Sequence, residues 1–292
     1  MVVFHRICAA IFARAAYVSF CLLRWKRATV YANLRHTGMA QDESCAGKLY
    51  RAILKNLARH AGELLFRFST FKKLPAALTA YPCRVDGWDF EIAEGSDAAL
   101  EKMRGGGIFL TAHYGNYEAI GPWLCRLGIP LTASYIPVRP AWLNRILDGR
   151  IRSVDGIPYG VDARTPREFV RLLDGGRLFC LLADQDSRIA GAIDGIFMGK
   201  PVRNNPLPDF LLRMRPGTAV FICWMDEPEP SRKGLHAVEI PATSVMDSFN
   251  AWLEGRIRDN PALWYGFTHR RFMSREPSLY GKACGKNPES AG

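Results

Sequence analysis

Residues 105–118 read GGGIFLTAHYGNYE, and this stretch predicts the fold around it. An apolar run typical of a buried strand leads into His113, and Glu118 follows five residues after the histidine. On an unbroken helix, a five-residue step leaves two side chains about 140° apart. Gly115 and Asn116 tolerate the backbone angles of a turn that could fold Glu118 back toward His113. The pattern therefore predicts a site at the carboxyl end of a strand, where open α/β sheets bind ligands.

The residue types in this stretch suit acid–base chemistry. A histidine can accept a proton near neutral pH, and a carboxylate beside it can hold the ring in one tautomer and stabilise the imidazolium. The spacing alone is weak, because a histidine followed by a glutamate at this distance also occurs in ordinary cores and surfaces. The preceding strand, the turn and the apolar continuation over 119–124 favour the active-site interpretation.

From about residue 86 the hydrophobic pattern alternates between strands and helices. We expect strands over 107–112, 130–135, 177–183, 218–225 and 235–240, and helices over 118–127, 141–153, 165–174, 207–215 and 248–259. Such alternation predicts an α/β fold with a mostly parallel twisted sheet covered by helices on both faces. The predicted organisation is an N-terminal segment of membrane-anchoring and basic amphipathic helices (1–85), a catalytic domain (86–275) and a flexible tail (276–292).

The N-terminal segment carries nearly all of the net charge of +11. Residues 1–75 contain 13 Lys or Arg but only 3 acidic residues. Such a surface attracts anionic lipid, an acidic protein or nucleic acid. Nucleic acid is not expected, because neither zinc-finger spacing nor an aromatic RNA-binding motif is present. A helix predicted over 46–71 combines an apolar stripe with a basic face, so it could pack on a core, lie against anionic headgroups, or do both.

The apolar run near the N-terminus predicts a membrane anchor. Ile7 to Leu23 is apolar, at the short end for a membrane span, and Arg14 interrupts it. Cations follow at once, which suits a cytoplasmic C-terminal flank, and no signal-peptidase site precedes them. The sequence leaves a short span and an interfacial helix as equal alternatives. The 8 cysteines form no Cys-x-x-Cys pair and several lie inside apolar runs, which favours a reducing, cytoplasmic setting.

Further candidate site residues follow two other predicted strands. Arg139 and Arg150 come after the strand at 130–135, and arginine is the preferred ligand of phosphate and carboxylate, although either residue could be a plain surface charge. Asp184 and Gln185 follow the strand at 177–183, where a capping turn is the alternative. The paired Asp184 and Asp186 could bind a metal, but they lack companion ligands, so no metal is expected. The chain has neither a dinucleotide-binding glycine motif, nor a P-loop, nor a serine nucleophile elbow, so we expect no nucleotide cofactor.

Four blocks, taken in order, resemble the bacterial late acyltransferases of lipid A assembly, the lauroyl and myristoyl transferases of the glycerolipid acyltransferase superfamily. The first is TAHYGNYE (111–118), which looks like the family's Ala-His-Phe-Gly-Asn-Trp-Glu. The others are Arg139-Pro140 with Gly149-Arg150, then ADQD (183–186) with FMGKP (197–201), and NPALW to HRRF (260–272). The resemblance extends over most of residues 20–273. The stretch 202–206 (VRNNP) departs from the family's threonine-rich pattern.

The resemblance implies a membrane-associated O-acyltransferase on the cytoplasmic face of the bacterial inner membrane. It implies an acyl thioester donor, either acyl-carrier protein or coenzyme A, and a hydroxyl acceptor on a lipid A precursor or related glycolipid. By position it implies His113 as general base, Glu118 as its orienting partner, and Arg150 and Asp184 as further catalytic residues. Substrate binding is assigned to Asn116, Arg139 and Gln185. Two alternatives remain open: acylation of another glycolipid or phospholipid, and a non-catalytic membrane-binding scaffold with the same fold.

Overall fold

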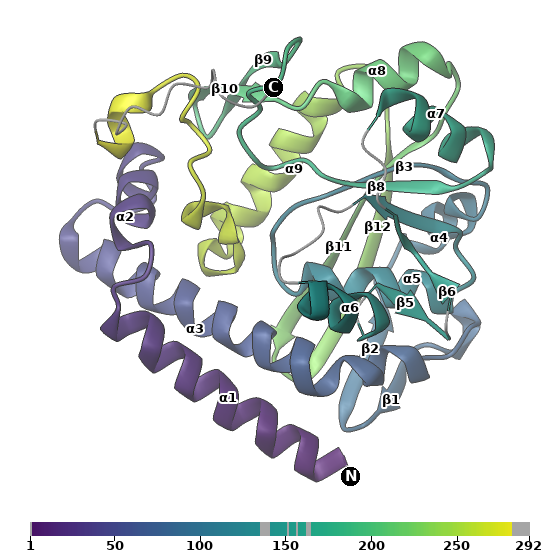
Figure 1. The fold of residues 1–292 in the computed structure, drawn as a ribbon, viewed down its shortest axis with the longest axis horizontal. Helices are drawn as coiled ribbons and strands as arrows, with labels where there is room; N and C mark the ends of the chain where they lie inside the picture. The colour runs from purple at the N-terminus through teal and green to yellow at the C-terminus, as the bar shows by residue number, and fades with distance from the viewer. Residues whose placement is uncertain (1, 135–140, 151, 156, 162–164, 282–292) are drawn as a thin grey trace.

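The computed structural model describes residues 2–134, 141–150, 152–155, 157–161 and 165–281 (Figure 1). The chain begins with three helices, and the third has an N-cap residue, Asp42. The Asp42 side chain accepts a hydrogen bond from the Cys45 amide at 2.7 Å, which satisfies one of the free N–H groups of the first turn. These helices are α1 (Val2–Leu22), α2 (Arg27–His36) and α3 (Glu43–Arg67), and two 3₁₀ helices follow, η1 (Phe68–Lys73) and η2 (Leu78–Ala80).

Eight strands of the described chain form one mixed, mostly parallel sheet in the order β1-β2-β12-β11-β3-β8-β4-β7. Five of its seven neighbouring pairs are parallel, and the two antiparallel pairs are β1–β2 and β11–β12. The strands are β1 (Cys83–Val85), β2 (Trp88–Ile92), β3 (Gly107–Thr111), β4 (Leu131–Ser134), β7 (Gly160–Val161), β8 (Leu178–Leu182), β11 (Val220–Glu229) and β12 (Arg232–Ile240). Two small antiparallel pairs stand apart, β5 (Ser153–Val154) with β6 (Ile157–Pro158), and β9 (Ile193–Phe197) with β10 (Lys200–Asn204).

The remaining helices connect these strands. The start of α7 (Pro166–Asp174) has a capping box, in which the Thr165 side chain accepts from the Glu168 amide and the Glu168 carboxylate accepts from the Thr165 amide. The other helices are α4 (Asp97–Met103), α5 (Ile120–Arg126), α6 (Ala141–Arg150), α8 (Leu207–Met214) and α9 (Val245–Asp259), with 3₁₀ helices η3 (Tyr117–Ala119), η4 (Pro261–Leu263), η5 (Tyr265–Thr268) and η6 (Pro277–Tyr280).

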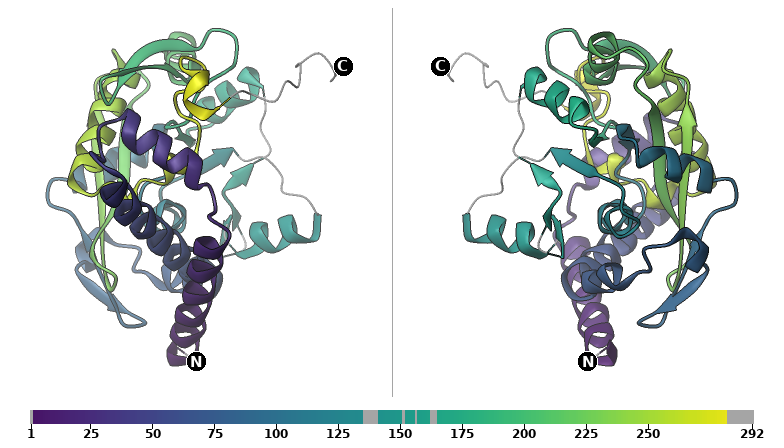
Figure 2. Two further views of the ribbon diagram at one scale, coloured as in Figure 1. Left: turned by 90° about the vertical axis from the view of Figure 1, so that its left-hand side faces the viewer. Right: turned by 90° about the vertical axis from the view of Figure 1, so that its right-hand side faces the viewer.

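Strand β3 lies in the middle of the sheet, and its side chains alternate between two hydrophobic clusters. Ile108 and Leu110 join a cluster that contains side chains of α2, α3, α8 and α9. Phe109 joins the other, which contains side chains of α4 and α5. The period of two along a strand produces this division. Residues from both sides of position 85 share each cluster, so the N-terminal helices and the sheet are packed as one body (Figure 2).

Most elements expected from hydrophobic pattern are present, with shifted ends. The α/β class and the mostly parallel sheet are confirmed. The pattern missed the β1–β2 hairpin and α4, and it did not identify the β11–β12 pair as antiparallel. The first part of the expected tail, residues 277–280, is a 3₁₀ helix, because the Tyr280 hydroxyl donates to Asn33 Oδ1 at 2.6 Å and so holds it to α2. The rest of the expected tail, from residue 282, lies outside the described residues.

Helix α1 is long and apolar enough to cross a membrane by length and composition, and little of its surface is buried. The antiparallel helix α3 lies beside it (Figure 1).

Candidate active site

The carboxyl end of β3 places His113 at the edge of the sheet. The strand ends at Thr111, and the chain then turns at Gly115, whose φ of +60° is the left-handed conformation that glycine adopts without strain. The Gly115 amide donates to the Leu263 carbonyl at 2.9 Å, and the Tyr265 amide donates to the His113 carbonyl at 2.8 Å. The segment 263–265 therefore fixes the backbone on both sides of the histidine.

Asp184 is the hydrogen-bonding partner of His113. His113 Nδ1 lies 2.8 Å from Asp184 Oδ1, and the His113 amide donates to Asp184 Oδ2 at 3.1 Å. Because β3 and β8 are parallel neighbours with Thr111 opposite Leu182, the residues that follow them meet at the same edge. The indole N–H of Trp264 also donates to Asp184 Oδ2, at 2.9 Å. A carboxylate that accepts from Nδ1 directs Nε2 to act as the base.

The electrostatics of the pair favour an ionised aspartate and a basic imidazole. Burial acts to raise the pKa of Asp184, but the charge of His113 and the hydrogen bonds from His113 and Trp264 outweigh it and lower this pKa to about 2. Burial acts to lower the pKa of His113, but Asp184, and after it Glu118, raise it above 6.5. The His113 side chain is 14% exposed, and no described residue hydrogen-bonds its Nε2. That nitrogen is accordingly available to a substrate.

Glu118 does not make the contact that the sequence predicted. Among the described residues none is hydrogen-bonded to its carboxylate, and the place beside His113 Nδ1 is taken by Asp184. The topology of the sheet explains this difference. Asp184 follows β8, the strand next to β3, whereas Glu118 lies within η3. Burial raises the pKa of Glu118, while the charges of His113 and Arg152 act to lower it. Glu118 thus acts on His113 through space.

The other predicted site residues have different outcomes. The buried side-chain amide of Asn116 donates to Glu63 Oε2 at 2.9 Å, so it holds the turn from inside rather than facing a substrate. Gln185 is exposed next to Asp184, and its carbonyl accepts from Arg271 at 2.8 Å. Arg150 is the last residue of α6, but its side chain lies outside what is described. Arg139 also lies outside the described residues.

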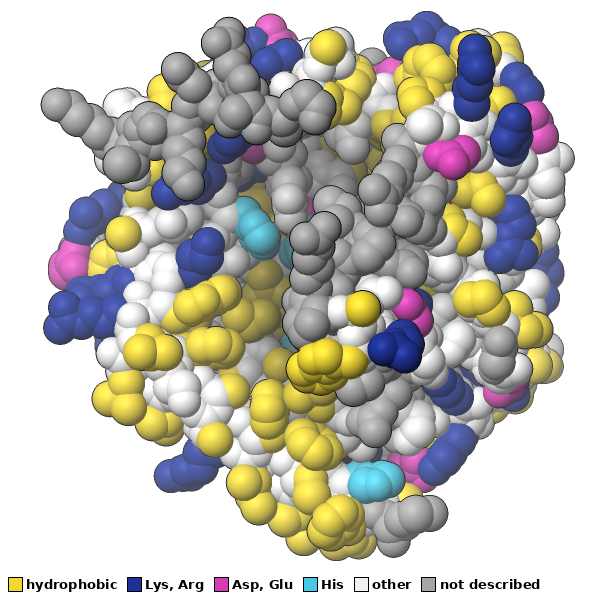
Figure 3. Space-filling view, viewed as in Figure 1, with side chains coloured by type: hydrophobic (Ala, Val, Ile, Leu, Met, Phe, Trp, Pro, Cys, Tyr) yellow, Lys and Arg dark blue, Asp and Glu magenta, His cyan; other side chains and the backbone are white. Residues whose placement is uncertain are grey.

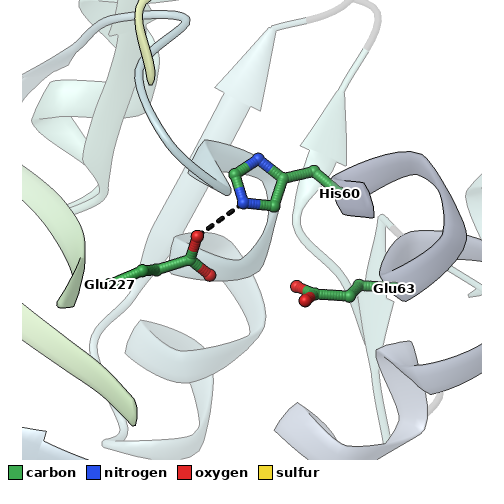
Figure 4. A group of neighbouring side chains, drawn as sticks. All are labelled: His60, Glu63 and Glu227. Carbon is green, nitrogen blue, oxygen red and sulfur yellow. Dashed lines mark hydrogen bonds and ion pairs between the residues drawn. The ribbon is translucent and has the colours of Figure 1, made fainter. Parts of the chain in front are cut away.

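Asn116 and Tyr265 connect the turn after His113 to a buried ion cluster, which we define as Arg59, His60, Glu63, Glu227 and Lys233. Arg59 donates to Glu63 at 3.0 Å and to Glu227 at 2.6 Å. Lys233 donates to both carboxylates, and His60 bonds Glu227 at 2.5 Å (Figure 4). The second nitrogen of His60 faces the Tyr265 hydroxyl. The cluster therefore joins α3 to the β11–β12 hairpin directly beneath the turn that carries His113.

Three members of this cluster have the geometry of a metal site. The ligand atoms of His60, Glu63 and Glu227 all lie within 4.8 Å of one another. The donor set does not suit a cation, because Arg59 and the fully buried Lys233 already bring positive charge to both carboxylates. Together with the remaining carboxylate–histidine contact, these ion pairs satisfy the cluster internally.

This donor set predicts that a chelator does not reduce activity. Treating the purified protein with excess EDTA should leave turnover and melting temperature unchanged, because Arg59 and Lys233 supply the neutralising charge. A stability loss that divalent ions reverse would instead assign a metal to His60, Glu63 and Glu227. Assaying the Lys233→Met variant with and without added divalent ions separates the two explanations.

Sequence reasoning underestimated the C-terminal segment 263–272. Trp264 holds Asp184, and the ring of His269 lies 5.4 Å from that of His113. Asn33, fully buried on α2, donates to the carbonyls of Phe267 and His269 at 2.8 Å each and so fixes this segment. Arg271 is 1% exposed and donates to the carbonyls of Gln185 and Arg203. The only signal in the sequence was the match of this stretch to the fourth resemblance block.

The rest of the site is apolar. A cavity of about 80 Å³ lies beside Glu118 between β3, β4 and β8, and its walls include Tyr117, Leu131, Tyr159 and Leu182. Pockets that bury a drug-sized ligand measure roughly 300–1,000 Å³, so this is a recess beside the site rather than a complete ligand pocket. Figure 3 shows a hollow in the surface of the molecule, with hydrophobic side chains and a histidine along its edge.

The His113–Asp184 contact predicts a specific pH dependence. A base whose pKa is raised above 6.5 is lost by protonation as the pH falls through that raised value. In Asp184→Asn the effect of burial on His113 meets less opposition, so the pKa of His113 should drop. Histidine NMR titration of both proteins measures this, with His113→Gln identifying the signal. An unchanged His113 pKa in Asp184→Asn would contradict the pairing.

Neither a scan against protein-family models nor a search of curated proteins finds a match for this chain.

Proposed function

We propose that the chain is a membrane-associated O-acyltransferase that moves a fatty acyl group from a thioester to a lipid hydroxyl. The observation that carries this proposal is the His113–Asp184 hydrogen bond of 2.8 Å at the carboxyl end of β3, with Nε2 left available and apolar surface beside it. An activated base next to apolar walls suits a substrate with a reactive hydroxyl and a hydrocarbon chain. The resemblance to the lipid A late acyltransferases points to the same reaction.

The reaction needs few groups from the protein. His113 Nε2 removes the proton of the acceptor hydroxyl as its oxygen attacks the thioester carbonyl carbon. The resulting tetrahedral intermediate collapses, the carbon–sulfur bond breaks, and the sulfur leaves with the electron pair. The imidazolium returns its proton to the thiolate, which gives one ester and one free thiol. Asp184 holds the ring and stabilises its positive charge throughout.

We propose an acyl-carrier protein or acyl coenzyme A as the donor. The basic N-terminal region would attract an acidic carrier, since opposite charges steer association. The acceptor is a lipid A precursor or a related glycolipid, and the location is the cytoplasmic face of a bacterial inner membrane. The proposal includes α1 as the anchor and a sheet covered by helices on both faces, which the division of β3 side chains between two clusters supports.

Lipid mass spectrometry of cells with and without the protein tests this function. Cells that express the wild-type chain should contain a glycolipid heavier by one acyl group, and cells that express His113→Gln should lack it. The identity of the shifted lipid separates a lipid A precursor from another glycolipid or a phospholipid. Equal lipid profiles in all three cell lines would favour the non-catalytic scaffold.

A further inference from the structure

Helix α1 lies along α3 in antiparallel orientation (Figure 1). In the N-terminal half of α1 the backbones approach so closely that a Cβ on Gly62 would lie 2.6 Å from the Ala9 carbonyl oxygen. The rings of Phe12 and Phe66 are 5.8 Å apart. Beyond the other end, the Tyr50 hydroxyl of α3 donates to the Trp25 carbonyl at 2.9 Å. The middle of α1 and the residues that follow its C-terminus are therefore attached to the same helix.

Helix α3 cannot enter the hydrocarbon of a membrane with α1. Its inner side carries Arg59, His60 and Glu63 of the buried ion cluster, which bind it to the β11–β12 hairpin. Its outer side carries exposed cations at Lys48, Arg51 and Lys55. Charged side chains at the centre of a bilayer are costly. A docked α1 must therefore lie flat on the catalytic domain, and it can span the membrane only by leaving α3.

The outward side of α1 is apolar apart from the exposed Arg14, which lies on the same face between Ile11 and Val18. Its exposed large hydrophobic residues follow steps of three, four and seven, which places them on one face of the helix. Figure 3 shows hydrophobic side chains gathered over this part of the surface. The residues are Val3, Phe4, Ile7, Ile11, Val18 and Leu22, and they are between 47% and 79% exposed. We call this set the α1 stripe.

The positive charge around the α1 stripe favours an anionic partner. Residues 1–41 contain no acidic residue and 6 Lys or Arg, among which Arg6, Arg14, Arg24 and Lys26 are exposed. An apolar helix face that carries one cation, Arg14, and is followed by the exposed Arg24 and Lys26 fits the boundary between headgroups and acyl chains of an anionic bilayer. An acidic soluble protein would match the cations but would not cover so long an apolar face.

We propose that α1 stays docked on α3 and lies in the plane of an anionic membrane surface, with the α1 stripe in the interface and both ends of α1 on the same side as the catalytic domain. This inference decides between the span and the interfacial helix. It rests on the membrane location in the proposed function but not on acyl transfer. It also accounts for Arg14, which in this orientation can reach the headgroups instead of crossing the hydrocarbon.

Vesicles with the full-length protein added from outside test the arrangement. The protein should float with phosphatidylcholine vesicles that contain phosphatidylglycerol, and less with phosphatidylcholine alone. In the floated fraction, a short bis-maleimide should join positions 12 and 66 of the Phe12→Cys/Phe66→Cys variant, as detected by mass spectrometry of the linked peptides. An impermeant maleimide should label the thiol of Arg6→Cys as fully in intact vesicles as after detergent.

Matched variants complete the design. Gly62→Val should reduce the 12–66 cross-link several-fold, because its side chain meets the Ala9 backbone, whereas Gly255→Val on α9 has open space and should not. The proposal would be overturned by two results together: floated Phe12→Cys/Phe66→Cys protein with Gly62 intact forms no 12–66 cross-link, and Arg6→Cys is labelled only after detergent. These results would establish that α1 spans the membrane. Failure to float would reject the membrane surface itself. The catalytic function would then be tested separately, by measuring whether acyl transfer in detergent micelles depends on His113.

Discussion

His113→Ala should lower the turnover number for acyl transfer by about 10²–10⁴-fold, the usual cost of losing a general base. The expected reason is that, among the described residues, no other histidine is hydrogen-bonded to the Asp184 carboxylate and could act as the base in its place. The measurement is steady-state kinetics with a purified acyl thioester and a lipid acceptor in mixed micelles. Turnover close to wild type in a folded variant would falsify the assignment of the base.

Stability has to be measured alongside activity. Removing the imidazole leaves the buried Asp184 with the His113 amide and the Trp264 indole as donors, and breaking a buried ion pair is destabilising. His113→Asn is the matched control, because its side-chain amide nitrogen takes the position of Nδ1 and can still donate to Asp184, but the side chain has no basic nitrogen. We expect His113→Asn to be as inactive as His113→Ala and to melt closer to the wild-type temperature.

Asp184→Asn should lower turnover by up to about 10⁴-fold, the loss seen when the aspartate of a serine protease triad becomes an amide that holds the wrong tautomer. Glu118→Gln should cost much less, because Glu118 acts on His113 only through space. The apparent affinity for either substrate should change little in both variants. Comparison of the two turnover numbers decides which carboxylate orients His113. A large loss of turnover in Glu118→Gln together with a small loss in Asp184→Asn would instead support the pairing of Glu118 with His113 that the local sequence predicted.

The local parts of this structure could be predicted from sequence. The strand ending at Thr111, the turn at Gly115 and the capping box at Thr165 depend on residues only a few positions apart, so their patterns are visible. The position of Asp184 at the end of a strand was also predicted. Its pairing with His113 was not, because it depends on β8 lying next to β3 although the strands β4 to β7 come between them in the chain.

Long-range contacts explain the remaining differences. Glu63 appeared in the sequence as one of few acids on a basic helix, and nothing local indicated that Lys233 and Asn116 would surround it. Asn33 and Trp264 lie far from His113 in the chain, so their roles became visible only when the C-terminal segment was placed beside the catalytic turn. The proposal of an interfacial α1 likewise rests on its packing against α3, which the sequence did not indicate.

The most direct test of the acyltransferase assignment is a balance of products. Purified protein is incubated with an isotopically labelled acyl thioester and a hydroxylated glycolipid, and the free thiol and the labelled ester are quantified together. The account predicts equal amounts of thiol and ester, both absent with His113→Gln. The acyltransferase assignment would be contradicted if the wild-type protein formed no more ester than His113→Gln does. This result would have to hold for lipid A precursors, other glycolipids and phospholipids, and with both carrier-protein and coenzyme A thioesters.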